Sequence, residues 1–175
     1  MSAGEWVFGY ASLMTDCPRA DAVAARLPGY RRVWGVAADN TRTVPGYKIY
    51  LDRADGSRPP VFVAFLDLKP DDEAVVNGLA SPVDGADLVE LDLRERNYDR
   101  VEVTGAVDGV AGRVWAYMGS AEGRARLREG VDRGSAVVSR DYVDKVHAGL
   151  TSLSDADRLP EGPPVRDLDS VDLAA

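Results

Sequence analysis

The sequence contains a single cysteine, Cys17, and a single histidine, His147. One cysteine excludes a disulfide within the chain, and the two residues together supply too few ligands for a Cys/His metal site. A Ser-His-Asp or Cys-His catalytic arrangement would need His147, which falls near the end of a predicted helix, where we expect a surface or capping role. We therefore expect no metal site. Any chemistry must depend on carboxylates, hydroxyls, arginines and the main chain.

Basic residues are also few. Lysine and arginine together number 21 against 29 aspartates and glutamates, which gives a net charge of -8. Nucleic-acid-binding domains normally carry a basic surface, so this balance argues against a nucleic-acid partner. The sequence lacks an apolar segment long enough to span a bilayer, and it does not open with a basic stretch followed by a long apolar run. We therefore expect no membrane attachment and a cytoplasmic location.

The composition is sufficient for one folded domain. The chain has 175 residues, of which 45% are hydrophobic, so a full core can form without disulfides. We predict a single domain over residues 1–150. Residues 151–175 form an acidic tail with prolines at positions 160, 163 and 164 and little periodicity. We expect this tail to be loosely ordered.

Hydrophobic periodicity and turn signals predict an alternation of strands and helices. The predicted strands cover residues 5–10, 31–38, 48–52, 60–68, 100–104 and 112–118. The predicted helices cover residues 20–27, 70–73, 86–96, 121–130 and 139–150. Cys17 would lie where the first helix begins, and we favour an inert residue there over a reactive thiolate because it has no base partner. The pattern predicts an α+β fold, a small mixed sheet or barrel of about six strands flanked by helices.

The stretch VFGYASLM, residues 7–14, combines an apolar strand with a loop of small residues. The strand breaks at Gly9, and small and hydroxylated residues follow. Small side chains leave the backbone uncovered, so main-chain N–H groups can face a ligand such as a carboxylate or an oxyanion. The alternative interpretation is a core strand followed by an ordinary turn.

Glu95 stands in line with apolar residues of a predicted helix. Leu88, Leu91 and Glu95 lie at positions i, i+3 and i+7, on one helical face. A glutamate in line with a buried face is costly unless it is paired or has a function. Desolvation raises the pKa of a carboxyl, which makes it a better proton carrier near neutral pH. We expect Tyr98, Tyr117 and Arg42 beside these two features, although Tyr98 could instead simply close the core.

Both features resemble motifs of the γ-glutamylcyclotransferase-like superfamily. The sequence GYASL, residues 9–13, is similar to its Tyr-Gly-Ser-Leu or Tyr-Gly-Ser-Asn signature, and LDLRERNYDR, residues 91–100, is similar to its Leu-Asp-x-x-Glu-x-x-Tyr-x-Arg segment. The Arg-x-x-Pro-Gly of residues 42–46 and the SRDY of residues 139–142 resemble the glutathione-degrading branch. The resemblance spans residues 6 to about 150, with the two main motifs in the same order and context.

The resemblance implies a small β-barrel flanked by helices, with a pocket between the loop and Glu95. It also implies a γ-glutamylcyclotransferase, in which the α-amine of a small γ-glutamyl substrate attacks its own γ-carbonyl to give 5-oxoproline and a free amine or peptide. No cofactor is needed because both reacting groups belong to one molecule. Glu95 matches the catalytic acid and base. The predicted substrate-binding residues are Gly9, Tyr10, Ala11, Ser12, Leu13, Arg42, Tyr98 and Tyr117.

The sequence departs from the superfamily at Ala11, where glycine is usual. A methyl group there narrows the pocket and would strain a left-handed backbone. Two other hypotheses therefore stand beside the enzyme: a catalytically silent module that binds a γ-glutamyl metabolite, and an interaction protein that works through its acidic tail. For the enzyme, the substrate could be glutathione, a γ-glutamyl amino acid or a γ-glutamylamine.

Overall fold

Two long antiparallel strands, β2 (Val23–Asp39) and β4 (Phe62–Val83), form the centre of the molecule. The structure is a computed structural model that describes residues 4–16, 20–153 and 158–175. The expectation for Cys17 lies outside the described residues. The first part of β4, residues 62–68, is buried along its whole length, as is typical of a strand covered on both faces. This part confirms the predicted strand over residues 60–68.

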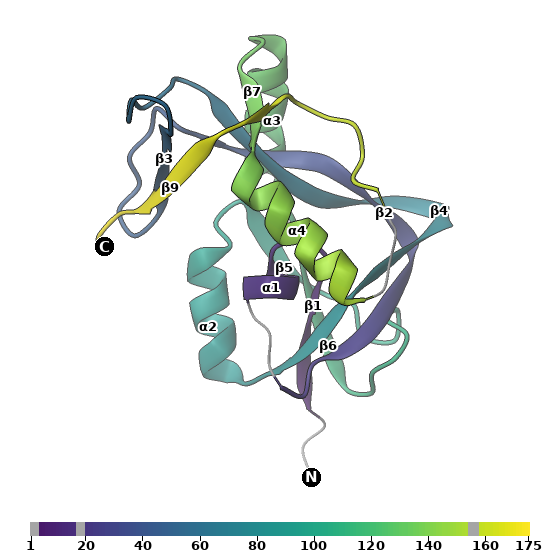
Figure 1. Ribbon diagram of the computed structural model, residues 1–175. Coiled ribbons are helices and arrows are strands. Elements are labelled where there is room, and N and C mark those ends of the chain that lie inside the picture. The colour runs from purple at the N-terminus through teal and green to yellow at the C-terminus, as the bar shows by residue number, and fades with distance from the viewer. Residues whose placement is uncertain (1–3, 17–19, 154–157) are drawn as a thin grey trace.

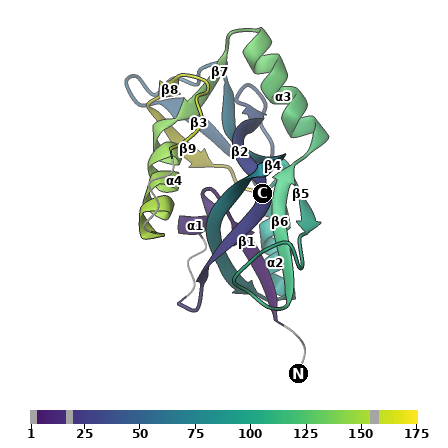
Figure 2. The same cartoon turned by 90° about the vertical axis from the view of Figure 1, so that its right-hand side faces the viewer.

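The remaining elements surround this pair (Figures 1 and 2). The other strands are β1 (Glu5–Gly9), β3 (Lys48–Asp52), β5 (Tyr98–Glu102), β6 (Arg113–Gly119), β7 (Ala136–Ser139), β8 (Val165–Arg166) and β9 (Leu168–Asp172). The helices are α1 (Leu13–Asp16), α2 (Gly85–Arg94), α3 (Ala121–Asp132) and α4 (Arg140–Ser152).

The strands form one seven-stranded sheet and one two-stranded sheet. The larger sheet has the order β5-β6-β1-β4-β7-β8, with β2 also paired to β4, and the smaller sheet pairs β3 with β9. Pairing is mixed, because β1 is parallel to β6 but antiparallel to β4. Figures 1 and 2 both show α3 beside β7 at one end of the molecule and α1 beside α4. The predicted α+β class, with a mixed sheet flanked by helices, is confirmed.

Two predicted helices are wrong, because both segments belong to the long strand pair. Within the expected helix over residues 20–27, Ala25 and Leu27 are buried while Arg26 between them is exposed, which is the period-two pattern of a strand. The Pro28-Gly29 pair does not end a helix but lies at a register shift, with Gly29 at φ 83°. The segment 70–73, expected as a helix, continues β4. Long-range pairing with β2 outweighs the local helix signals in both segments.

The described part of the tail is paired with the domain, contrary to the loose order expected for residues 151–175. β8 pairs with β7, and β9 pairs with β3 over five residues. Leu168 is fully buried in the main core. Acidic residues of this segment meet arginines of the domain, since Arg53 contacts Asp169 at 2.8 Å. The acid-rich composition therefore reflects ion pairing with the domain rather than a segment without structure.

The three longer helices lie close to where they were predicted. α2 begins in a capping box, in which the Asp84 carboxylate accepts a bond from the Asp87 N–H and the Asp87 carboxylate accepts one from the Asp84 N–H. α4 buries Val146 and Leu150, while His147 is exposed on the same helix, in agreement with the expected surface role. Among the described residues, no helix has the length and apolar character needed to cross a membrane.

Candidate active site

The loop of residues 10–12 connects β1 to α1 and lines a small cavity. The N–H groups of Met14 and Asp16 donate to the carbonyls of Ala11 and Ser12 at 3.1 and 2.9 Å. In the described parts of the chain, no hydrogen bond uses the N–H groups of Ala11, Ser12 or Leu13 as donors. These three neighbouring N–H groups are therefore available to a ligand, as expected for a loop with small side chains.

Glu95 directly follows α2 as its C-terminal cap. The predicted helix extended to Arg96, but α2 ends at Arg94, and the Glu95 N–H donates to the Leu91 carbonyl at 2.8 Å. Leu88 and Leu91 are buried as expected, and the Glu95 side chain is only 13% exposed. Burial raises the pKa of the Glu95 carboxyl, while the positive charges of Arg94 and Lys48 partly oppose this rise.

A small cavity brings Glu95 and the loop together. Its volume is about 20 Å³, and it is lined by Tyr10, Ala11, Ser12, Leu13, Glu95, Tyr98, Tyr117 and Tyr142. Seven of these eight residues were predicted from the sequence as site residues. Glu95 and the loop thus line one cavity, which is the juxtaposition that the resemblance implied.

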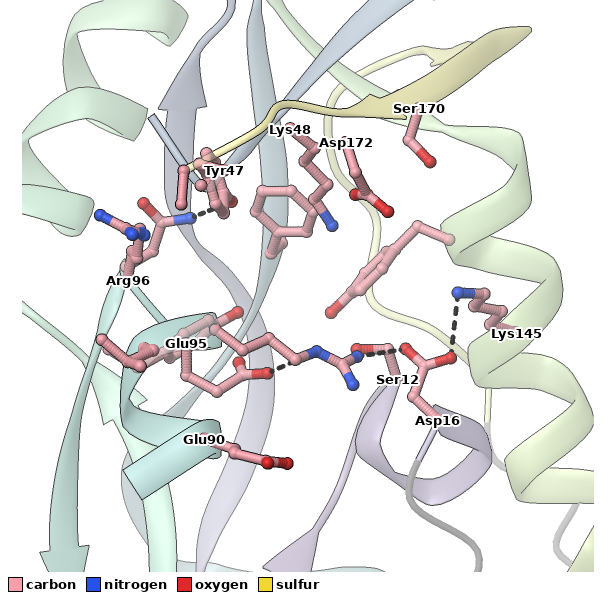
Figure 3. A pocket seen from close by; sticks show the side chains of 18 residues that line it. Ser12, Asp16, Tyr47, Lys48, Glu90, Glu95, Arg96, Lys145, Ser170 and Asp172 are labelled. Carbon is pink, nitrogen blue, oxygen red and sulfur yellow. Dashed lines mark hydrogen bonds and ion pairs between the residues drawn. The ribbon is translucent and has the colours of Figure 1, made fainter. Parts of the chain in front are cut away.

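The small cavity is adjacent to a much larger one. The larger cavity has a volume of about 740 Å³, within the range of small-molecule sites, and also includes Ser12, Glu95, Tyr98 and Tyr142. Figure 3 shows its walls, which come from α2, α4, the start of β3 and the C-terminal strand β9. Its other charged lining residues are Asp16, Lys48, Glu90, Arg94, Arg96, Lys145 and Asp172.

A chain of opposite charges crosses the larger cavity (Figure 3). The Nε of Arg94 lies 3.5 Å from a Glu95 carboxylate oxygen, and the same guanidinium donates a hydrogen bond to Asp16. Asp16 also contacts the ammonium of Lys145 at 3.0 Å. Arg94 thus pairs with both Asp16 and Glu95.

The tyrosine hydroxyls around the small cavity are all hydrogen-bonded. Tyr98 donates to the Leu66 carbonyl at 2.7 Å, and Tyr142 accepts from the Leu66 N–H at 3.0 Å. Tyr10 donates to the carbonyl of Tyr117 at 2.7 Å, and Tyr117 donates to Asp92 at 2.8 Å. Burial raises the pKa of the Tyr98 and Tyr10 hydroxyls. These side chains therefore form a neutral wall that fixes the shape of the cavity.

Two predicted substrate-binding residues lie apart from the others. Gly9 is the buried last residue of β1 and lines neither cavity; a Cβ there would come within 3.1 Å of the Leu13 Cβ. A side chain at that position would require the start of α1 to shift by a few tenths of an ångström, because the helix packs closely on the strand. The Arg42 side chain is 77% exposed and lies 3.5 Å from Asp39. It lines a third cavity, of about 410 Å³, which also reaches Glu95 and Tyr98.

Several lining residues were not predicted from the sequence as site residues. Tyr142 was assigned to the apolar face of the last helix, and Lys48 to an ordinary strand. Asp172 lies in the segment expected to be loosely ordered. Lys48 and Asp172 have no local sequence signal, because each reaches the cavity through long-range strand pairing; Tyr142 ends the SRDY motif, which was not assigned to the site. The described residues contain no group of three or more His, Cys, Asp or Glu side chains that could hold a metal ion.

The sequence matches one protein family over most of its length. The family model for γ-glutamyl cyclotransferase, AIG2-like proteins matches residues 7–142, which include the loop and Glu95. The chain belongs to this family. The match confirms the γ-glutamylcyclotransferase-like resemblance carried by the two motifs. A search of curated protein sequences finds no significant match.

Solved structures of γ-glutamyl cyclotransferases share the fold. A yeast γ-glutamyl cyclotransferase specific to glutathione is 14% identical, with a TM-score of 0.57 and coverage of 89% of this chain and 92% of the yeast chain. Another γ-glutamyl cyclotransferase is 13% identical, with a TM-score of 0.51 and coverage of 85% and 79%. An uncharacterized human protein is similar at 13% identity and a TM-score of 0.51, covering 87% and 80%. The AIG2-like family is thus consistent with the fold as well as with the sequence.

Proposed function

We propose that this protein is a γ-glutamylcyclotransferase that converts the γ-glutamyl group of a small peptide or amine to 5-oxoproline. The observation that carries the proposal is the juxtaposition of the Glu95 carboxyl with the loop of residues 10–13 around the small cavity. Membership of the γ-glutamyl cyclotransferase, AIG2-like family supports the same reaction class.

In the proposed reaction, Glu95 carries one proton between two nitrogens. The carboxylate accepts a proton from the substrate's α-ammonium, and the freed amine attacks the γ-carbonyl carbon. A C–N bond forms within the glutamyl group, and the C–N bond to the leaving amine breaks. Glu95 then gives its proton to the leaving nitrogen, and the new ring nitrogen releases its second proton to the freed amine, which departs as an ammonium. The raised pKa of the buried Glu95 carboxyl suits both transfers near neutral pH.

The loop would supply binding and charge stabilisation. The N–H groups of Ala11, Ser12 and Leu13 can donate to the substrate carboxylate and to the oxygen of the reacting carbonyl. Donors aimed at a developing oxyanion commonly contribute about 3 kcal/mol to lowering a barrier. The cavity need only hold the glutamyl chain in a folded conformation, because nucleophile and electrophile belong to one molecule.

The test is to assay 5-oxoproline with glutathione, a γ-glutamyl amino acid and a γ-glutamylamine. The Glu95→Gln variant should lose about 10²- to 10⁴-fold in kcat on any accepted substrate, the usual contribution of a general acid–base. Glu90→Gln is the matched control, because Glu90 lines the larger cavity but is exposed and absent from the small one. Full turnover by Glu95→Gln would reject the mechanism.

Ala11 favours a second candidate, a catalytically silent module that binds γ-glutamyl metabolites. Ala11 lines a cavity of only about 20 Å³. The 5-oxoproline assay separates the two candidates. The silent module would bind a γ-glutamyl compound in calorimetry but would form no 5-oxoproline from any member of the panel.

A further inference from the structure

Lys48 is a cation in the larger cavity that the proposed reaction does not use. It is the first residue of β3, and Figure 3 shows its side chain directed into the cavity. The ammonium lies 5.3 Å from the ring centroid of Phe65, 5.7 Å from that of Tyr50 and 5.9 Å from that of Tyr47. Three aromatic rings thus surround a half-buried positive charge, an arrangement that stabilises a cation through the faces of the rings.

The rings do not satisfy the hydrogen bonds of the ammonium. An ammonium has three N–H donors, and the structure gives Lys48 Nζ no hydrogen bond or ion pair with any described residue. Arg94 and Lys145 differ in this respect, since both contact Asp16. Asp172 is the Cα partner of Lys48 in the strand pair and lines the same cavity, but it forms no ion pair with Lys48. The cavity therefore offers a positive charge to an anionic ligand.

The position of Lys48 indicates which part of a γ-glutamyl substrate it meets. The small cavity is lined by the loop and Glu95, where the glutamyl group would be cyclised, and Lys48 does not line it. Lys48 lines the two larger cavities, which adjoin the small one through Glu95 and Tyr98. A substrate with its glutamyl group at Glu95 would extend its leaving group toward Lys48. The anion available in a leaving group of this kind is a carboxylate.

We propose that Lys48 is a specificity-determining residue whose ammonium binds a carboxylate on the leaving amine. The protein then prefers γ-glutamyl peptides and γ-glutamyl amino acids to γ-glutamylamines without that carboxylate. This inference rests on the proposed function, because it takes the glutamyl group to lie at Glu95.

The experiment compares two substrates that differ only in the charge of one group, γ-glutamylalanine and γ-glutamylalaninamide. The wild-type protein should favour γ-glutamylalanine by about 10- to 100-fold in kcat/KM, the usual effect of a hydrogen bond to a charged group. Lys48→Met keeps the aliphatic chain against the rings and removes the charge, so this preference should fall to about threefold or less. Lys48→Arg keeps the charge and should retain most of the preference.

Arg96→Met is the matched control, because Arg96 is an exposed cation that lines the same cavity. It should change the substrate preference by less than about threefold. Thermal unfolding of each variant checks that Lys48→Met still folds. An equal loss on both substrates in Lys48→Met, or an unchanged preference, would overturn the assignment.

Calorimetry separates this inference from the proposed activity. The same two compounds are titrated into Glu95→Gln protein with and without Lys48→Met. Tighter binding of γ-glutamylalanine that disappears with Lys48→Met supports the role of Lys48 even if the wild type forms no 5-oxoproline, a result that would reject only the activity. Binding of γ-glutamylalanine that does not depend on Lys48, or no binding of either compound, overturns the role of Lys48.

Discussion

The Nε of Arg32 donates a hydrogen bond of 2.7 Å to the main-chain carbonyl of Tyr10. The same guanidinium donates through its Nη2 to the carbonyl of Asn77. One side chain from β2 thus connects the loop after β1 to β4. The orientation of the loop's free N–H groups depends on this connection, because the Tyr10 carbonyl belongs to the peptide group that contains the Ala11 N–H.

We expect Arg32→Lys to reduce kcat/KM by about tenfold or more and to lower the free energy of unfolding by about 1–3 kcal/mol. A lysine ammonium cannot reproduce the fork of the guanidinium, so at least one of the two carbonyls loses its donor. Steady-state kinetics and urea denaturation measure the two effects. Arg31→Lys is the control, since Arg31 is half exposed and lies 3.5 Å from Asp71. Equal kinetics in the two variants would contradict the role of Arg32.

The raised pKa of Glu95 predicts how stability changes with pH. Because burial raises its pKa in the folded state, the folded protein binds this proton more tightly than the unfolded chain does. The resulting stabilisation is complete below the pKa of the unfolded chain and is lost as pH rises through the pKa of the folded protein. Glu95→Gln should therefore gain stability relative to the wild type as pH increases from about 4 to 8.

Urea denaturation of both proteins over this pH range tests the prediction. The difference in unfolding free energy between the variant and the wild type isolates Glu95 from other titrating groups. A difference that stays constant with pH would mean that the carboxyl is not desolvated in the folded state.

We expect Ala11→Gly to raise kcat/KM severalfold and to lower stability by about 1 kcal/mol. Ala11 lines the small cavity, so removing its methyl group should enlarge the space for the glutamyl group. The stability loss combines greater chain entropy with the loss of one buried carbon. The control is Ala116→Gly, in a fully buried part of β6 away from the cavities, which should lose stability without a gain in kcat/KM. A fall in kcat/KM for Ala11→Gly would show that the methyl group does not restrict the substrate.

We expect Leu168→Ala to lower the free energy of unfolding by about 2–5 kcal/mol, as is usual for a leucine in a core. Leu168 is fully buried and begins β9, which forms one wall of the larger cavity. Val171→Ala is the control, because Val171 is 41% exposed on the same strand, and it should change stability by less than about 0.5 kcal/mol. Similar effects of the two substitutions would mean that β9 is loosely packed, as the composition of the tail suggested.

The site could be predicted where its signals are local. The loop of small residues after the first strand and the glutamate in line with Leu88 and Leu91 each fall within a short stretch, and the structure brings them together at one cavity. Glu95 directly follows α2, a helix that the periodicity of Leu88 and Leu91 indicates and that begins in a capping box.

The parts that could not be predicted depend on distant partners. Residues 23–27 have a helical composition, but their pairing with residues 76–80 of β4 makes them a strand. Leu168 is one of several scattered apolar residues in an acidic segment, and only the structure shows that it is buried in the core. The local sequence does not distinguish Lys48 from any other lysine in a strand. Only the structure shows the three aromatic rings around it.

Arg94 shares its guanidinium between Glu95 and Asp16, and Asp16 ends the short helix that begins at the loop. Neutralising Glu95 removes one of the two acids that pair with Arg94 and leaves Asp16 as its only acidic partner among the described residues. An anion bound by the loop interacts with the same charges of Arg94 and Asp16. Binding of the anion and protonation of Glu95 must therefore change each other's equilibrium constants by equal factors. Ligand binding will therefore be accompanied by an exchange of protons with the buffer, and its measured heat will vary with the ionisation enthalpy of the buffer chosen.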